Sequence, residues 1–148
     1  MTDDKAGSNL EAAALPLLLQ RIAIAVFMAV WALDKFVNPQ HSVNVFAHFY
    51  GIALPAETTW AVGLVQLAII LAFALGFMKR VSYLLVFLMH AASTLASWKV
   101  YLALFGEGGN LLFWAAIPVL AATFMQYRLR DHDRIALDDH LKKAPAVS

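Results

Sequence analysis

The residues of this chain that could do chemistry lie inside an otherwise apolar segment. His90, Thr94, Ser97 and Tyr101 recur at helical spacing, so one helix face carries an imidazole followed by three hydroxyl groups. Histidine changes charge near neutral pH more readily than other side chains, so His90 could donate or accept a proton. The same residues could equally serve as hydrogen-bonding contacts between packed helices.

Gln66 is the expected neighbour of His90. Gln66 lies thirteen residues before Lys79, and His90 lies eleven residues after it. In a helical hairpin that turns near Lys79, the two side chains would differ in depth by about 3 Å. They could bond to each other, or they could form a pocket for a quinone headgroup or another lipid-soluble ligand. No second histidine lies at this depth, so the chain alone does not supply two axial haem ligands.

A second group of polar residues is expected at the opposite end of the hairpin. Asp34, Lys35, Glu57 and Lys99 fall at one level, and a buried charge needs a partner. We therefore expect Asp34 and Lys35 to pair with Lys99, with Glu57 or with the segment at residues 41–52. Such a cluster could simply specify the helix packing, or it could bind an anion or a lipid headgroup.

Residues 41–52 predict a short amphipathic helix that lies flat at a membrane interface. His41, Asn44 and His48 share one of its faces. The two histidines are seven residues apart, about 10 Å along a helix axis, which is too far for them to chelate one metal ion. We expect them to face solvent or headgroups, and we expect no metal site.

The composition indicates which elements hold these residues. Of 148 residues, 61% are hydrophobic and 14% are charged, whereas soluble domains are roughly half apolar and about a quarter charged. A chain this short cannot hide that excess in one core, so a bilayer is the expected solvent. The net charge of +1 gives no basic field for nucleic acid. The absence of cysteine excludes disulfides and thiolate-bound metals within the chain.

The apolar segments predict an all-α, single-domain bundle of four transmembrane helices over residues 1–148. We place the helices at about 15–37, 59–77, 81–104 and 111–127, with a polar N-terminus at 1–9 and a charged tail at 128–148. Only twelve apolar residues separate Arg21 from Asp34, so Arg21 and Lys35 are expected to snorkel toward opposite interfaces. The first segment is too long for a cleaved signal peptide and is expected to remain as an anchor.

The loops predict the orientation. Lys79 and Arg80 lie between the second and third predicted helices, and five further lysines and arginines follow the fourth. The loops after Lys35 and around Glu107 contain no lysine or arginine. Because cytoplasmic loops are enriched in basic residues, both termini are expected in the cytoplasm, with a bacterial inner membrane as the location.

The pattern resembles the DoxX family of small bacterial membrane proteins. The shared features are Arg21 early in the first helix, residues 33–36 (Leu-Asp-Lys-Phe) at its end followed by Pro39, and residues 49–52 (Phe-Tyr-Gly-Ile). The resemblance covers about residues 15–128. It departs from the family at Ala32 and Leu33, where a glycine often precedes the Asp-Lys pair. It implies a four-helix bundle and, for some relatives, association with quinone-linked sulfur oxidation or terminal oxidase complexes.

Three functions remain open at this stage. The first is a non-catalytic accessory subunit of a membrane redox complex, with no intrinsic cofactor and with a quinone or lipid as the ligand. The second is a free-standing transporter or lipid-binding protein that acts as a homo-oligomer, since four helices form a narrow pathway at best. The third is a structural or assembly factor whose polar residues serve only packing.

Overall fold

The regular secondary structure of the described residues is all helical, which confirms the predicted all-α class. A computed structural model describes the backbone of residues 2–103 and 110–143 and the side chains of residues 12–103 and 110–142. The principal helices are α1 (Thr2–Val37), α3 (Ala56–Leu75), α4 (Lys79–Ala96) and α6 (Ala116–Arg128). The shorter elements are α2 (Pro39–Val45), the π-helix η1 (Phe46–Tyr50), α5 (Trp98–Leu102), the 3₁₀-helix η2 (Leu111–Ala115) and α7 (Leu137–Lys143).

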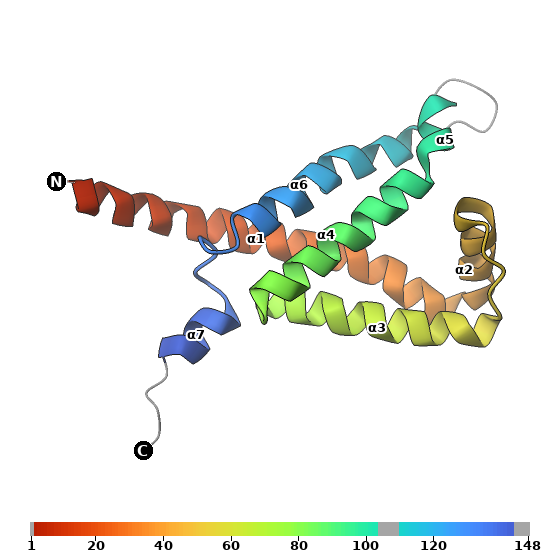
Figure 1. Ribbon diagram of the computed structural model, residues 1–148, viewed down its shortest axis with the longest axis horizontal. Coiled ribbons are helices and arrows are strands. Elements are labelled where there is room, and N and C mark those ends of the chain that lie inside the picture. The colour runs from red at the N-terminus through yellow and green to blue at the C-terminus, as the bar shows by residue number, and fades with distance from the viewer. Residues whose placement is uncertain (1, 104–109, 144–148) are drawn as a thin grey trace, which may run out of the picture.

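The four long helices pack in a ring. α1 packs chiefly on α3, α4 packs chiefly on α6, and contacts of α3 with α4 and of α1 with α6 join the two pairs. In Figure 1, α7 and the start of α1 lie at one end of the molecule, and α2 and α5 lie at the other. We call these the terminal end and the far end.

Small residues let α1 and α3 approach closely. A Cβ atom on Gly63 would lie 2.7 Å from the Phe36 ring, so a larger residue at this crossing would require that ring to move. The apolar core continues toward the terminal end through Ala32, Met28, Ile70 and other side chains of α1, α3 and α4. Such small-residue contacts are typical of helices that pack without a strong hydrophobic drive.

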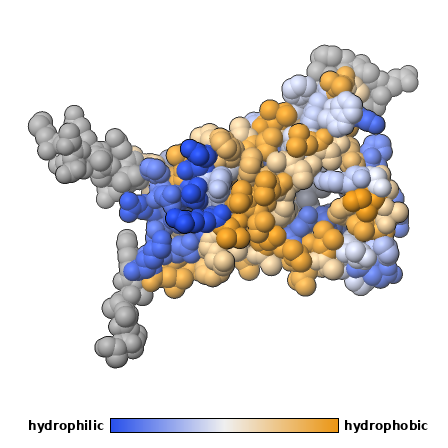
Figure 2. Space-filling view, viewed as in Figure 1, coloured by the Kyte–Doolittle hydropathy of each residue, from blue (hydrophilic) through white to orange (hydrophobic). Residues whose placement is uncertain are grey.

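Three described segments are long and apolar enough to cross a membrane. They are Ala12–Val37, Ala56–Leu75 and Leu111–Arg128, and they correspond to the first, second and fourth predicted helices. α4 does not meet this criterion. On the face shown in Figure 2, hydrophobic residues lie across the middle of the molecule and hydrophilic residues gather toward both ends. This distribution is that of a membrane protein.

The helix boundaries differ from the predicted ones for local reasons. α1 begins at Thr2, so residues 2–9 of the predicted polar N-terminus are helical. α4 begins at Lys79 rather than at residue 81, because Gly76 (φ 68°) and Met78 (φ 48°) complete the turn before it. The helix predicted at 81–104 is interrupted at Ser97, whose hydroxyl donates to the Ser93 carbonyl. Serine bonds of this kind bend helices.

The segment predicted as one helix at residues 41–52 is two short elements. α2 begins at Pro39 after the Asn38 cap, whose side chain accepts from the His41 amide. The helix then widens into the π-helix η1, which ends at Gly51, a residue with a left-handed backbone conformation (φ 66°). Residue 104 of the third predicted helix and the predicted loop at 106–109, including Glu107, lie outside the described residues.

Candidate functional site

The polar face of α4 points into the bundle. His90, Thr94 and Ser97 are each at most 7% exposed, and they share this buried face with Lys79, Ser82, Tyr83 and Val86. The opposite face carries Val81, Leu88 and Leu95, which are 48%, 49% and 70% exposed. The helix is therefore polar on the inside and apolar on the outside, the reverse of an amphipathic helix at the surface of a soluble protein. The polar residues of α4 lower its mean hydropathy, so the helix does not meet the criterion for a membrane span.

His90 bonds to α6 rather than to Gln66. The His90 Nε2 atom lies 3.0 Å from the Ala116 carbonyl oxygen, so this nitrogen carries the proton. The ring also meets the Phe27 ring edge-on, with centroids 5.7 Å apart. Gln66 is only half-buried, and its expected bond to His90 does not form in this structure. The hairpin count predicted only the depths of the two residues, and it could not show that α4 turns this face toward α6.

The rest of the His90 stripe bonds mainly within its own helix. The Thr94 hydroxyl donates to the His90 carbonyl at 2.8 Å, and the Ser97 hydroxyl donates to the Ser93 carbonyl at 3.0 Å. The Tyr101 ring packs edge-on against Trp114, and its buried hydroxyl has no hydrogen-bond partner among the described residues. The Thr94 and Ser97 hydroxyls therefore bond to backbone carbonyls of α4, and His90 is the member of the stripe with a hydrogen bond to another helix among the described residues.

The charged residues at the far end do not assemble as one cluster. Asp34 pairs with His41 of α2, at 2.5 Å between Oδ2 and Nδ1, which is the loop-segment partner that the sequence allowed. Lys35 is 9% exposed and donates to the Trp31 carbonyl one turn earlier, at 3.0 Å. Glu57 lies exposed in the first turn of α3.

The remaining members of the expected far-end groups also lie apart. Lys99 is exposed, and its ammonium group lies 5.7 Å from the centre of the Trp98 ring. No ion pair among the described residues joins it to Asp34 or Glu57. Asn44 accepts from Gln40 at 3.2 Å, and His48 packs edge-on against Phe49. No group of three histidine or acidic residues that could hold a metal ion occurs in the described part of the chain.

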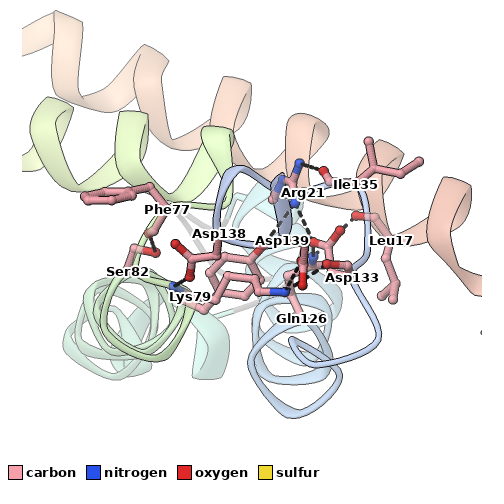
Figure 3. A network of polar contacts seen from close by, with 11 residues as sticks. Leu17, Arg21, Phe77, Lys79, Ser82, Gln126, Asp133, Ile135, Asp138 and Asp139 are labelled. Atoms are coloured by element: carbon pink, nitrogen blue, oxygen red, sulfur yellow. Dashed lines mark hydrogen bonds and ion pairs between the residues drawn. The ribbon is translucent and has the colours of Figure 1, made fainter. Parts of the chain in front are cut away.

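The most densely bonded polar group of the described residues lies at the terminal end, where the sequence had predicted only a charged tail. We call it the Arg21 cluster, and it consists of Arg21, Tyr83, Gln126 and Asp133. All four side chains are at most 2% exposed. Figure 3 shows Arg21 of α1 reaching toward Asp133 and Ile135, two residues of the segment that follows α6. The prediction that Arg21 snorkels outward is therefore wrong, because the chain supplies its own counter-ion.

A single carboxylate oxygen gathers this cluster. Asp133 Oδ2 accepts from Arg21 Nη1 at 2.6 Å, from the Tyr83 hydroxyl at 2.7 Å and from Gln126 Nε2 at 3.0 Å. Arg21 Nη1 also donates to the Tyr83 oxygen at 3.0 Å, and Nη2 donates to the Ile135 carbonyl at 2.6 Å. Residues from α1, α4 and α6 thus meet at one point. A buried ion pair of this kind depends on such additional hydrogen bonds to offset its desolvation cost.

Carboxylates of α7 hold the tail against the start of α4. Asp138 accepts from the backbone amides of Met78 and Lys79, both at 2.9 Å, and so caps α4 from outside the helix. Lys79 Nζ donates to Asp139 at 2.6 Å and to the Asp133 carbonyl at 3.0 Å. Close contact reinforces these bonds, because a Cβ atom on Gly76 would lie 2.5 Å from that of Ala136.

The described surface is hollowed between α1 and α6. Two adjoining hollows of about 420 and 290 Å³ share Gln20 in their walls. On the α1 side they follow one helix face from Ala13 to Phe27, and on the α6 side they run from Pro118 to Leu129, with His132 at the terminal end. We call this groove the α1–α6 seam. It was not predicted, and small side chains such as Ala23 and Ala122 leave it open.

A signal for the Arg21 cluster does exist in the sequence. Arg21 falls at the same level as Lys79, and apart from the first eleven residues the acidic residues near that level all lie in the tail, at 131, 133, 138 and 139. A search for the counter-ion of Arg21 among the acidic residues at its level would therefore have led to the tail. In comparison with known proteins, no family model, no curated protein and no solved structure matches the chain.

Proposed function

We propose that this chain is an integral protein of the bacterial inner membrane, with four spans and both termini in the cytoplasm. In this proposal α1, α3 and α6 supply three spans and α4 with α5 supplies the fourth. The observation that carries the proposal is the inverted α4, whose buried face is polar and whose exposed face is apolar. Exposing the leucines of such a helix to water would cost free energy, whereas a bilayer is a favourable environment for them.

Its proposed role is that of a non-catalytic accessory subunit in a quinone-linked or respiratory redox complex. Two considerations support this role. His90, Thr94 and Ser97 are bonded to backbone carbonyls, and Arg21 and Asp133 form a buried ion pair, so these polar groups are engaged within the chain. The resemblance to DoxX proteins suggests the partner, since some of those proteins associate with quinone-linked sulfur oxidation or terminal oxidase complexes. A quinone or lipid would then meet the outside of the bundle rather than the His90 stripe.

The transport function receives less support from the same contacts. A path through the bundle needs polar groups that remain available to a solute. The buried lysines Lys35 and Lys79 lie at opposite ends of the molecule, and each is already bonded within the chain. Neither hollow of the described residues runs through the interior, since both lie between α1 and α6 on the surface.

Purification in a mild detergent tests the accessory role. The tagged chain is expected to bring down, at fixed stoichiometry, a membrane subunit that carries a redox cofactor, detectable by its visible spectrum and by mass spectrometry. An unrelated four-span protein with the same tag is the control for chance association. Recovery of the chain only as a homo-oligomer that moves a solute in proteoliposomes would favour the transport function instead.

A further inference from the structure

The α1–α6 seam is the weakest contact in the ring of long helices, and its walls are apolar. The residues that line it on α1 recur at spacings of three and four, so they form one continuous helix face. Several of the lining side chains are small, namely Ala13, Pro16, Ala23, Pro118 and Ala122. In a bilayer an empty apolar groove loses dispersion contacts along both walls, so something must fill it.

The length of the seam indicates what fills it. Ala13 and Phe27 are fourteen residues apart, which is about 21 Å along α1. A transmembrane helix of a partner would run the whole hydrocarbon core of about 30 Å. The seam instead begins at the terminal end and stops at Phe27 and Pro118, ten residues before α1 ends. A groove limited to one side of the molecule suits a lipid of one leaflet.

The charge at the mouth of the seam indicates which lipid. His132 lines the terminal end of the groove, and the same turn of chain carries Arg128 and Arg134, both exposed. In the segment that follows α6, the Asp133 carboxylate is buried against Arg21 and the Asp131 carboxylate is exposed. Figure 2 shows strongly hydrophilic residues gathered at this end beside the hydrophobic band. Basic residues at the cytoplasmic mouth of a groove between membrane helices favour an anionic headgroup.

We propose that the α1–α6 seam binds one anionic phospholipid of the cytoplasmic leaflet. An acyl chain lies along the seam past Gln20 toward Phe27, and the phosphate lies beside His132, Arg128 and Arg134. Gln20, at the junction of the two hollows, is placed to donate to an ester carbonyl of the same lipid. This inference rests on the proposed membrane location but not on the identity of any redox partner.

Native mass spectrometry of the detergent-purified full chain tests the inference, with phosphatidylglycerol and phosphatidylcholine added as matched probes. We expect one phosphatidylglycerol to be retained in preference to phosphatidylcholine. The variant Arg128→Gln/Arg134→Gln should weaken retention about 25-fold, since each basic residue near an anionic surface contributes roughly a factor of five. Arg80→Gln, which removes an exposed charge at the same end on α4, should leave retention unchanged.

Filling the groove gives a second, independent test. Ala23→Trp places a large ring in the seam and should abolish the retained lipid, whereas Ala68→Trp, on an exposed position of α3, should not. Far-ultraviolet circular dichroism checks that both variants fold. Equal retention of the two lipids, or full retention in Ala23→Trp, would overturn the inference. So would cross-linking of an Ala23→Cys probe to a protein helix.

These outcomes can be separated from failure of the proposed function. A chain that stays in aqueous buffer without detergent would contradict the membrane location and the lipid site together. A chain that co-purifies with a redox subunit but shows no lipid preference would retain the function and lose only the lipid site. A chain that binds phosphatidylglycerol selectively but has no redox partner would retain the site alone.

Discussion

At the terminal end, a single residue joins three of the long helices. Asp133 lies in a segment with no long helix of its own, yet its carboxylate joins α1, α4 and α6 through Arg21, Tyr83 and Gln126. One of its oxygens takes all three donors, and the other has no partner among the described residues. A buried ion pair is weak evidence of net stability by itself, but removing one member leaves the other charge uncompensated.

Asp133→Ala should therefore destabilise the protein by about 3–5 kcal/mol, because it leaves the Arg21 guanidinium buried without its counter-ion. The free energy of unfolding in detergent measures the loss. Asp131→Ala is the matched control, since that carboxylate is 72% exposed and lies 3.9 Å from Arg130. The double variant Arg21→Leu/Asp133→Leu should recover most of the stability. A stability loss no larger than that of the control would mean that the pair does not hold the tail.

Substitutions of His90 test whether the polar face of α4 is structural. Glutamine at this position can still donate to the Ala116 carbonyl, so His90→Gln should lower the melting temperature little and leave the activity of the partner complex intact. His90→Leu removes the donor and should cost about 1–3 kcal/mol, because the Ala116 carbonyl is left without it. A His90→Gln protein that folds and assembles but has lost quinone-dependent turnover would show that the imidazole takes part in the reaction.

At the scale of elements, the sequence predicted helix type well and helix partners poorly. The four long segments were found because apolar runs of this length have few alternatives. The depth count from the hairpin predicted His90 and Gln66 at a similar level, but a depth count does not fix the rotation of a helix about its axis. α4 turns its polar face toward α6, so His90 meets Ala116 and Phe27 instead. The tail was missed because its bonds to α1 and α4 are contacts between distant parts of the chain.

The attachment of α7 makes an element-scale prediction. Asp138→Ala removes the carboxylate that caps the first amides of α4, at a cost of about 1 kcal/mol. The tail should then open more often, and trypsin should cleave after Arg134 about fivefold faster in the intact, membrane-embedded protein. Asp131→Ala changes the formal charge equally but touches neither amide, so its cleavage rate should match the parent protein. Equal rates for Asp138→Ala and the parent protein would contradict this attachment.

At the scale of the whole molecule, polar and apolar residues on the surface are separated along the long axis of the molecule. On the face shown in Figure 2, hydrophilic residues gather toward both ends and hydrophobic residues lie across the middle. Inside, buried charged side chains are bonded within the chain, as at Arg21, Lys35 and Lys79. The sequence predicted this distribution from composition and from the positions of lysine and arginine. It could not predict the α1–α6 seam, which depends on which small residues of two helices happen to face each other.

Four single-cysteine probes test the proposed topology most directly, since the parent chain has no cysteine. The positions are His48→Cys, Arg80→Cys, Leu112→Cys and Asp131→Cys, all exposed in the structure. His48 and Leu112 lie between successive long helices, Arg80 lies in the first turn of α4, and Asp131 follows α6, so each crossing is tested separately. We expect a membrane-impermeant maleimide added to intact cells to label 48 and 112, and to label 80 and 131 only after the membrane is opened. Labelling of 112 on the same side as 80 would show that α4 does not cross, and would contradict the four-span account.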